Sequence, residues 1–98
     1  MSLNIKELFD VSGKVALVTG GSRGIGEMIT SGFLANGTKV YITARKEEAL
    51  NLKAKELSTK YDLECIPFSG DLSTLEGIEE LVNFINEVEP DGIDYLIN

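Results

Sequence analysis

A glycine-rich run near the start of the chain has the composition of a phosphate-binding turn. Residues 19–26 read TGGSRGIG, follow the apolar run Val15–Val18 and open a segment with helical spacing. Glycine lets a backbone turn tightly and approach a ligand, and the first N–H groups of a helix have no partner within that helix. The sequence therefore predicts that a phosphate binds at this turn. A turn that merely connects a strand to a helix is the alternative.

Other reactive side chains are scarce. The chain has one cysteine, Cys65, and no histidine, so it forms no internal disulfide and lacks the usual zinc patterns. Because Cys65 lies in an apolar run, we predict a buried core thiol and not a reactive one. The sequence has no catalytic triad and no Walker-type Gly-Lys-Ser/Thr, and we expect no metal site.

The segments that must position the glycine-rich run alternate between strand and helix patterns. Apolar runs predict strands at residues 15–19, 40–42, 63–68 and 93–97. Helical spacing predicts one helix that ends near Asn36-Gly37, one over 47–60, and one with apolar residues from Leu75 to Val88. This alternation predicts an α/β fold with a parallel sheet.

Two local features complete this prediction. Ser73 followed by Glu76 fits a capping box at the start of the third helix. Before the first strand, Leu8, Phe9 and Val11 are expected to pack on the sheet edge.

Right-handed crossovers limit how the strands are ordered. In the order 3-2-1-4, the first two helices cover one face of the sheet, the third covers the other, and a ligand crevice opens between strands one and four. Strand four would then be an exposed edge, although the run 93–97 is suited to a sheet interior. We therefore expect that these 98 residues are part of one larger domain.

Several landmarks occur in a familiar order along almost the whole chain. The run from Thr19 reads T-G-x-x-x-G-x-G, Asp71-Leu72 follows strand three, and Leu96-Ile97-Asn98 ends strand four. Together with residues 13–19, they resemble the short-chain dehydrogenase/reductase family. The resemblance implies a Rossmann-type parallel sheet with helices on both faces. It also implies that residues 1–98 are the N-terminal part of a single NAD(P)-binding domain whose C-terminal half is absent.

The end of strand two indicates which cofactor is used. NAD-binding Rossmann folds have an acidic residue there that accepts a hydrogen bond from the ribose 2′-OH. This chain has Ala44-Arg45, so no carboxylate repels a 2′-phosphate and Arg45 can pair with it. Arg23 offers a second positive charge, which favours NADP(H) over NAD(H). The alternative is that both arginines are solvated surface charges.

The resemblance implies further contacts to the cofactor. Asp71 would accept a hydrogen bond from the adenine amino group and the backbone of Leu72 would help to read the ring; a turn aspartate before a helix is the alternative. Asn98 matches the first Asn of the family's Asn-Asn-Ala-Gly motif and would contact the ribose or brace strand four. The predicted cofactor site comprises Gly20, Ser22, Arg23, Gly24, Ile25, Gly26, Arg45, Asp71, Leu72 and Asn98.

The family's catalytic residues are not found in this sequence. Its Tyr-x-x-x-Lys pair, Ser and further Asn all lie beyond the position of Asn98, and Tyr41, Tyr61 and Tyr95 lack the matching Lys. We expect no catalytic residue and no activity in the isolated chain. The full-length protein is expected to transfer hydride between NADP(H) and a small-molecule carbonyl or secondary alcohol. The alternatives are a truncated, non-catalytic nucleotide-binding module or a stub that completes a partner's sheet.

Charge and hydropathy bear on partners. The net charge of −7 disfavours nucleic-acid binding. Neither a signal peptide nor a membrane span is expected, which predicts a cytoplasmic protein. The resemblance implies that the full-length form is a homo-oligomer.

Overall fold

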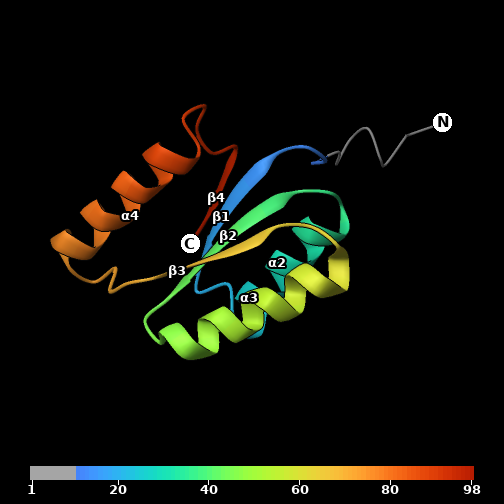
Figure 1. Cartoon of the computed structure of the whole chain (residues 1–98), viewed down its shortest axis with the longest axis horizontal. Helices are drawn as coiled ribbons and strands as arrows, with labels where there is room; N and C mark the ends of the chain where they lie inside the picture. The colour runs from blue at the N-terminus through green and yellow to red at the C-terminus, as the bar shows by residue number, and fades with distance from the viewer. Residues whose placement is uncertain (1–10) are drawn as a thin grey trace.

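A four-stranded parallel sheet forms the centre of the protein. Figure 1 shows a computed structural model, which describes residues 11–98. The strand order is β3-β2-β1-β4 and every neighbouring pair is parallel, which confirms the predicted α/β fold and the order 3-2-1-4. The elements are β1 (Val15–Thr19), α2 (Gly24–Ala35), β2 (Lys39–Ala44), α3 (Glu47–Tyr61), β3 (Cys65–Ser69), α4 (Leu75–Val88) and β4 (Tyr95–Ile97).

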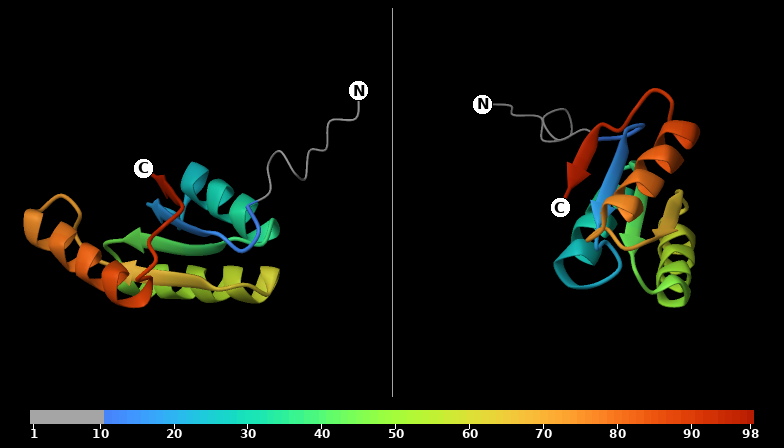
Figure 2. Two further views of the ribbon diagram at one scale, coloured as in Figure 1. Left: turned by 90° about the horizontal axis from the view of Figure 1, so that it is seen from above. Right: turned by 90° about the vertical axis from the view of Figure 1, so that its left-hand side faces the viewer.

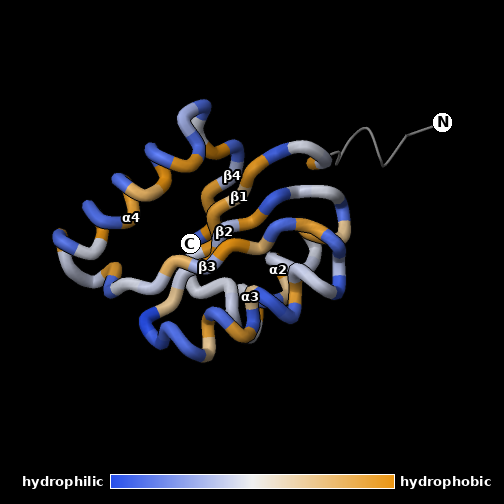
Figure 3. Tube along the Cα trace, viewed as in Figure 1, coloured by the Kyte–Doolittle hydropathy of each residue, from blue (hydrophilic) through white to orange (hydrophobic). Residues whose placement is uncertain are grey.

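Each face of the sheet has its own apolar core. Helices α2 and α3 cover one face and α4 lies on the other (Figure 2). Along β1, Ala16 and Val18 pack toward α2 and α3, while Leu17 between them packs toward α4. Because the central strands are buried on both faces, their sequences are nearly continuous apolar runs, visible as orange segments in Figure 3.

The outer strands differ from the prediction at their ends. Strand β3 begins two residues later than predicted and ends at Ser69, and it carries Pro67 at an edge of the sheet, where one side needs no donor. Strand β4 is limited to Tyr95–Ile97. Asp94 precedes it and uses both its N–H and its carboxylate to bond to the backbone of Val15, so ladder pairing begins only at Ala16 and Tyr95.

The predicted capping box at the start of α4 is wrong by one residue. Thr74 is the N-cap, and its hydroxyl accepts a hydrogen bond from the Gly77 N–H at 3.0 Å. Ser73 lies in the turn before the helix, where its N–H and its hydroxyl both donate to the Asp71 carboxylate. A local turn has therefore displaced the helix start.

The remaining predictions about helix ends and flanking residues have mixed outcomes. The end of α2 at Asn36 is confirmed, with Gly37 following at a φ of +88°. The expected packing of Leu8 and Phe9 lies outside the described residues. Within residues 11–98, none of the helices has the length and apolar character needed to cross a membrane.

Candidate functional site

The loops that follow β1, β2 and β3 meet at the carboxyl edge of the sheet. The N–H of Gly20 donates to the carbonyl of Thr43 at 2.9 Å, and the N–H of Gly70 donates to that of Ala44 at 3.1 Å. These two bonds tie each loop to its neighbour. The residues predicted from three separate segments of the sequence are therefore brought to one edge.

The glycine-rich turn needs its glycines for two different reasons. Gly20 and Gly24 have positive φ angles of 70° and 58°, which side chains with a Cβ rarely adopt. Gly26 and Gly21 are needed for space: a Cβ would lie 2.2 Å from the carbonyl oxygen of Gly20 in the first case and 2.6 Å from Cγ2 of Ile42 in the second. Gly21 was not among the predicted site residues, because its constraint comes from β2.

Two helix N-termini open toward this edge without a side-chain cap. Arg23 is the N-cap of α2 and Lys46 is the N-cap of α3, and neither side chain bonds to its own helix. The third helix is different, since Thr74 caps α4. The first N–H groups of α2 and α3 are thus available to a ligand, and the dipoles of both helices favour an anion there.

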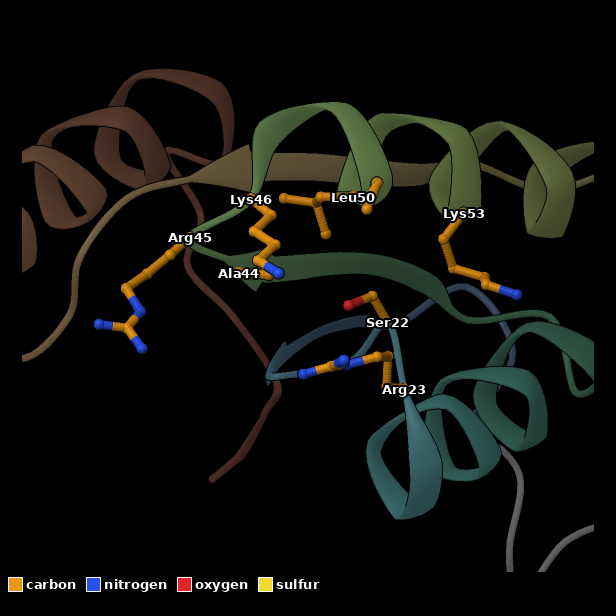
Figure 4. Close-up of a pocket in the computed structure, with 8 residues that line it drawn as sticks. Ser22, Arg23, Ala44, Arg45, Lys46, Leu50 and Lys53 are labelled. Atoms are coloured by element: carbon orange, nitrogen blue, oxygen red, sulfur yellow. The ribbon is translucent and has the colours of Figure 1, made fainter.

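Between these two helix starts lies a basic pocket of about 310 Å³. Arg23 and Arg45, predicted to face each other across the site, both line it, and Ser22 and Ala44 lie between them (Figure 4). The basic pocket is lined by Ser22, Arg23, Ala44, Arg45, Lys46, Ala49, Leu50 and Lys53. Four of its eight lining residues are therefore cationic in a chain whose net charge is −7.

The two lysines of the basic pocket were missed by sequence reasoning. Lys46 reaches from the start of α3 toward Ser22 (Figure 4), and its place directly after Arg45 was the available signal. Lys53 lies 3.4 Å from Glu27 and 3.0 Å from Glu56, so two carboxylates already balance its charge. The cations left for an anionic ligand are Arg23, Arg45 and Lys46.

A second hollow, the strand-end pocket, has a volume of about 390 Å³. Arg45 lines both pockets and so stands at their junction. Asp71 and Leu72, predicted to contact adenine, also line this second pocket. Its lining residues are Thr19, Gly20, Thr43, Ala44, Arg45, Gly70, Asp71, Leu72 and Ser73.

Asp71 is held in place as an anion. Its Oδ1 accepts hydrogen bonds from the hydroxyl and the N–H of Ser73, and these bonds, with a smaller contribution from the charge of Arg45, lower the pKa of the carboxyl. The structure thus contains the turn aspartate given above as the alternative. Within residues 11–98 its Oδ2 makes no hydrogen bond, so one oxygen is still available to a ligand.

The loop that carries Asp71 is pressed against the first turn of α4. A Cβ on Gly77 would lie 1.9 Å from the carbonyl oxygen of Asp71, and the Thr74 hydroxyl donates to that same oxygen at 3.1 Å. Glycine at position 77 is therefore required for this packing. Sequence reasoning missed it because the contact depends on how the helix meets the loop.

The other predicted residues lie along the same edge. Gly24, Ile25 and Gly26 form the start of α2, where the side chain of Ile25 is 75 % exposed. Asn98 does not line either pocket but is joined to the strand-end pocket through Thr19, whose hydroxyl donates to the Asn98 side chain at 3.0 Å.

Within residues 11–98, the two titratable side chains that are buried lie away from this edge. Cys65 is buried as predicted, and burial raises the pKa of its thiol to about 11. Tyr41 is buried in β2 and donates its hydroxyl to Glu89 at the end of α4, which also binds Lys39 at 2.6 Å. Burial, followed by the Glu89 bond, raises the pKa of Tyr41 to about 12. Neither group is prepared for proton transfer near neutral pH.

A family model described as short chain dehydrogenase matches residues 14–98. The chain belongs to the short-chain dehydrogenase family. It is 43% identical over 90 residues to a rhamnolipids biosynthesis 3-oxoacyl-[acyl-carrier-protein] reductase of Pseudomonas aeruginosa, covering 92% of this chain and 34% of that protein. It is 36% identical over 92 residues to the 3-oxoacyl-[acyl-carrier-protein] reductase FabG of Aquifex aeolicus, covering 90% of this chain and 35% of that one.

Solved structures of dehydrogenases and reductases have the same fold. The Pseudomonas aeruginosa RhlG/NADP active-site complex matches with a TM-score of 0.83 and 42% identity, over 90% of this chain and 34% of that one. L-Sorbose reductase from Gluconobacter frateurii, in complex with NADPH and L-sorbose, matches with a TM-score of 0.83 and 34% identity, over 89% of this chain and 33% of that one. The chain thus spans about a third of the length of these short-chain dehydrogenases.

Proposed function

We propose that this chain is the NADP(H)-binding portion of a short-chain dehydrogenase/reductase. The observation that carries the proposal is the basic pocket, in which Arg23, Arg45 and Lys46 surround the uncharged Ala44. An acidic residue at the position of Ala44 would repel a 2′-phosphate, and three cations without carboxylate partners within residues 11–98 attract one. Relatives solved with NADP or NADPH support this assignment.

The residues of the turn suit the rest of a dinucleotide. Because Gly26 lies directly against the carbonyl of Gly20, α2 begins immediately at the turn, and the open N–H groups of residues 24–26 would donate to a pyrophosphate there. Asp71, with one oxygen free and a lowered pKa, would accept from the adenine amino group in the strand-end pocket. Leu72 would border the ring, and Asn98 would hold the ribose side through Thr19.

When bound, the cofactor would supply or accept the hydride in the reaction. The residues of this chain would bind and orient it: cations neutralise the 2′-phosphate, the α2 terminus holds the pyrophosphate, and the strand-end pocket receives the adenine. We propose that the whole protein transfers this hydride to or from a carbonyl or secondary alcohol and that residues beyond this chain provide the acid–base group and the substrate pocket.

Exposed apolar side chains support the proposal that these residues are one part of a single larger domain. Leu96 on the edge strand β4 is 64 % exposed, and on α4 Ile78 and Val82 are 44 % and 50 % exposed. An apolar sheet edge and an apolar helix face of this kind normally pack against further structure. The shared length with relatives, about a third of each, agrees with this.

The test is cofactor preference in the full-length protein that carries this chain. Arg45→Asp removes a cation from the basic pocket and adds a carboxylate, so the ratio of kcat/KM with NADPH to that with NADH should fall at least tenfold, about the effect of one charge-assisted hydrogen bond. Lys55→Glu is the control, because it makes the same charge change on an exposed residue of α3 outside both pockets. An unchanged ratio in Arg45→Asp would remove the basis for a 2′-phosphate site.

A further inference from the structure

A buried threonine supports the glycine-rich turn from below. Thr30 in α2 is fully buried, and its hydroxyl lies 2.8 Å from the carbonyl oxygen of Gly26 and 3.2 Å from that of Gly21. The first contact is the common bond of a helical threonine to the preceding turn of its own helix. The second reaches back to the turn itself, and because a hydroxyl has one proton, Thr30 shares that proton between the two carbonyl oxygens.

The turn rests directly on this threonine. A Cβ on Gly21 would lie 2.8 Å from the Thr30 hydroxyl oxygen and 2.6 Å from Cγ2 of Ile42. Gly21 is itself buried, although its neighbours Gly20 and Ser22 are exposed and half-buried. Thr30 and Ile42 therefore form the floor on which this peptide lies.

The contact to Gly21 determines which way the next peptide group faces. Because the Gly21 carbonyl turns inward to Thr30, the planar trans peptide directs the N–H of Ser22 the opposite way, out of the core. Ser22 lines the basic pocket. If this peptide were flipped, the carbonyl oxygen would face the pocket and repel an anion.

We propose that Thr30 is a positioning residue for the dinucleotide. Its hydroxyl holds the Gly21–Ser22 peptide with the N–H toward the ligand and the carbonyl toward the core. This role rests on the proposed function for the identity of the ligand, but the orientation of the turn is a property of the protein itself. Ser22 lines the pocket proposed for the 2′-phosphate, so Thr30 affects the binding of NADPH more than that of NADH, and it does so without the change of charge that Arg45→Asp makes.

The experiment compares three variants of the full-length protein. Thr30→Val keeps the shape of the side chain and removes the hydroxyl, and Thr30→Ser restores the hydroxyl. Thr38→Val is the matched control, because Thr38 is also fully buried and its hydroxyl donates to the carbonyl of Val11 at 2.7 Å, before β2 and away from the site. Binding of NADPH and of NADH is measured by fluorescence titration, and amide hydrogen exchange is followed over residues 20–26.

Thr30→Val should weaken NADPH binding about tenfold, the effect of one buried hydrogen bond, weaken NADH binding less, and speed exchange in the turn. Thr30→Ser should restore both readouts, and Thr38→Val should change neither. Wild-type binding and turn exchange in Thr30→Val would overturn the inference, as would an equal loss of binding in Thr38→Val. If the wild-type protein bound neither cofactor, the proposed function would fail, and the exchange of the turn amides alone would still decide the role of Thr30.

Discussion

At the scale of single residues, the cofactor preference proposed here depends on the charges around Ala44. Arg45 lines both pockets: it faces the proposed 2′-phosphate on one side, and on the other it adds a small contribution to the Ser73 hydrogen bonds that lower the pKa of Asp71. Lys53 illustrates why a count of cations is not enough, since Glu27 and Glu56 already pair with it. The ion pairs that each cationic side chain already forms decide which of these side chains can bind an anionic ligand.

The Glu89 carboxylate is expected to make the free energy of unfolding depend on pH. Its bonds to Lys39, and then to Tyr41, lower the pKa of its carboxyl from the ordinary value of 4.5. A lowered pKa means that this contribution is complete above about pH 4.5 and is lost as the pH falls through the folded-state value. Glu89→Gln should therefore flatten the acid side of the curve of unfolding free energy against pH, measured by urea titration. An equally steep loss in the variant would contradict this account.

At the scale of elements, contacts of the first turns of α2 fix the position of this helix against the glycine-rich turn. The helix begins so close to β1 that Gly26 has no room for a side chain, and Thr30 one turn later fastens the same segment. The N-termini of α2 and α3 point into one pocket because both helices cover the same face of the sheet. Helix α4 covers the other face and is capped by its own threonine.

Two glycines of α2 offer a matched pair of substitutions. Gly26→Ala would put a Cβ 2.2 Å from the carbonyl oxygen of Gly20, so it should destabilise the full-length protein by more than about 2 kcal/mol and weaken NADPH binding. Gly32→Ala meets nothing within 4 Å and should stabilise it by up to about 1 kcal/mol, because alanine favours a helix. Chemical denaturation measures both, and similar effects of the two changes would refute the steric argument.

At the scale of the whole molecule, the two helical layers that cover the sheet are unequal within the described residues. Helices α2 and α3 pack beside each other on one face, whereas α4 lies alone on the other (Figure 2). Strand β4 contributes only three residues at an open edge. The described residues offer a proposed place for a cofactor, and the acid–base group that acts on a substrate is proposed to lie beyond this chain.

The purified 98-residue chain is therefore expected to oxidise no NADPH in the presence of carbonyl compounds. It should also unfold at a lower temperature than the full-length protein, because Leu96 and the outer side of α4 stay in water. Following NADPH absorbance with a panel of ketones and sugars tests the first expectation, and thermal unfolding tests the second. Full-length protein in the same assays is the control. Turnover by the short chain would contradict the proposal that residues beyond this chain provide the acid–base group.

Much of this organisation is predictable from local sequence. Within residues 11–98 the apolar runs predicted the strands and helical spacing predicted the helices, and the structure brings the glycine-rich turn, Arg45 and Asp71 to one edge of the sheet. These signals are local, because each depends on neighbouring residues or on a fixed spacing. The same locality explains the error at the start of α4. Ser73 and Thr74 are both residue types that cap helices, and only the structure shows that Ser73 bonds to Asp71 in the preceding turn while Thr74 is the N-cap.

The sequence by itself determined the alternation of strands and helices, the glycine-rich turn between the first strand and helix, and the family. Only the tertiary structure decided that Lys46 faces the site while Lys53 is paired, that Gly21 and Gly77 have no room for a Cβ, and that Thr30 lies under the turn. The physical reason is that these features depend on distances between segments far apart in the chain. Residue types and local spacing are written in the sequence, but the space left between a helix, a strand and a loop exists only once they have packed.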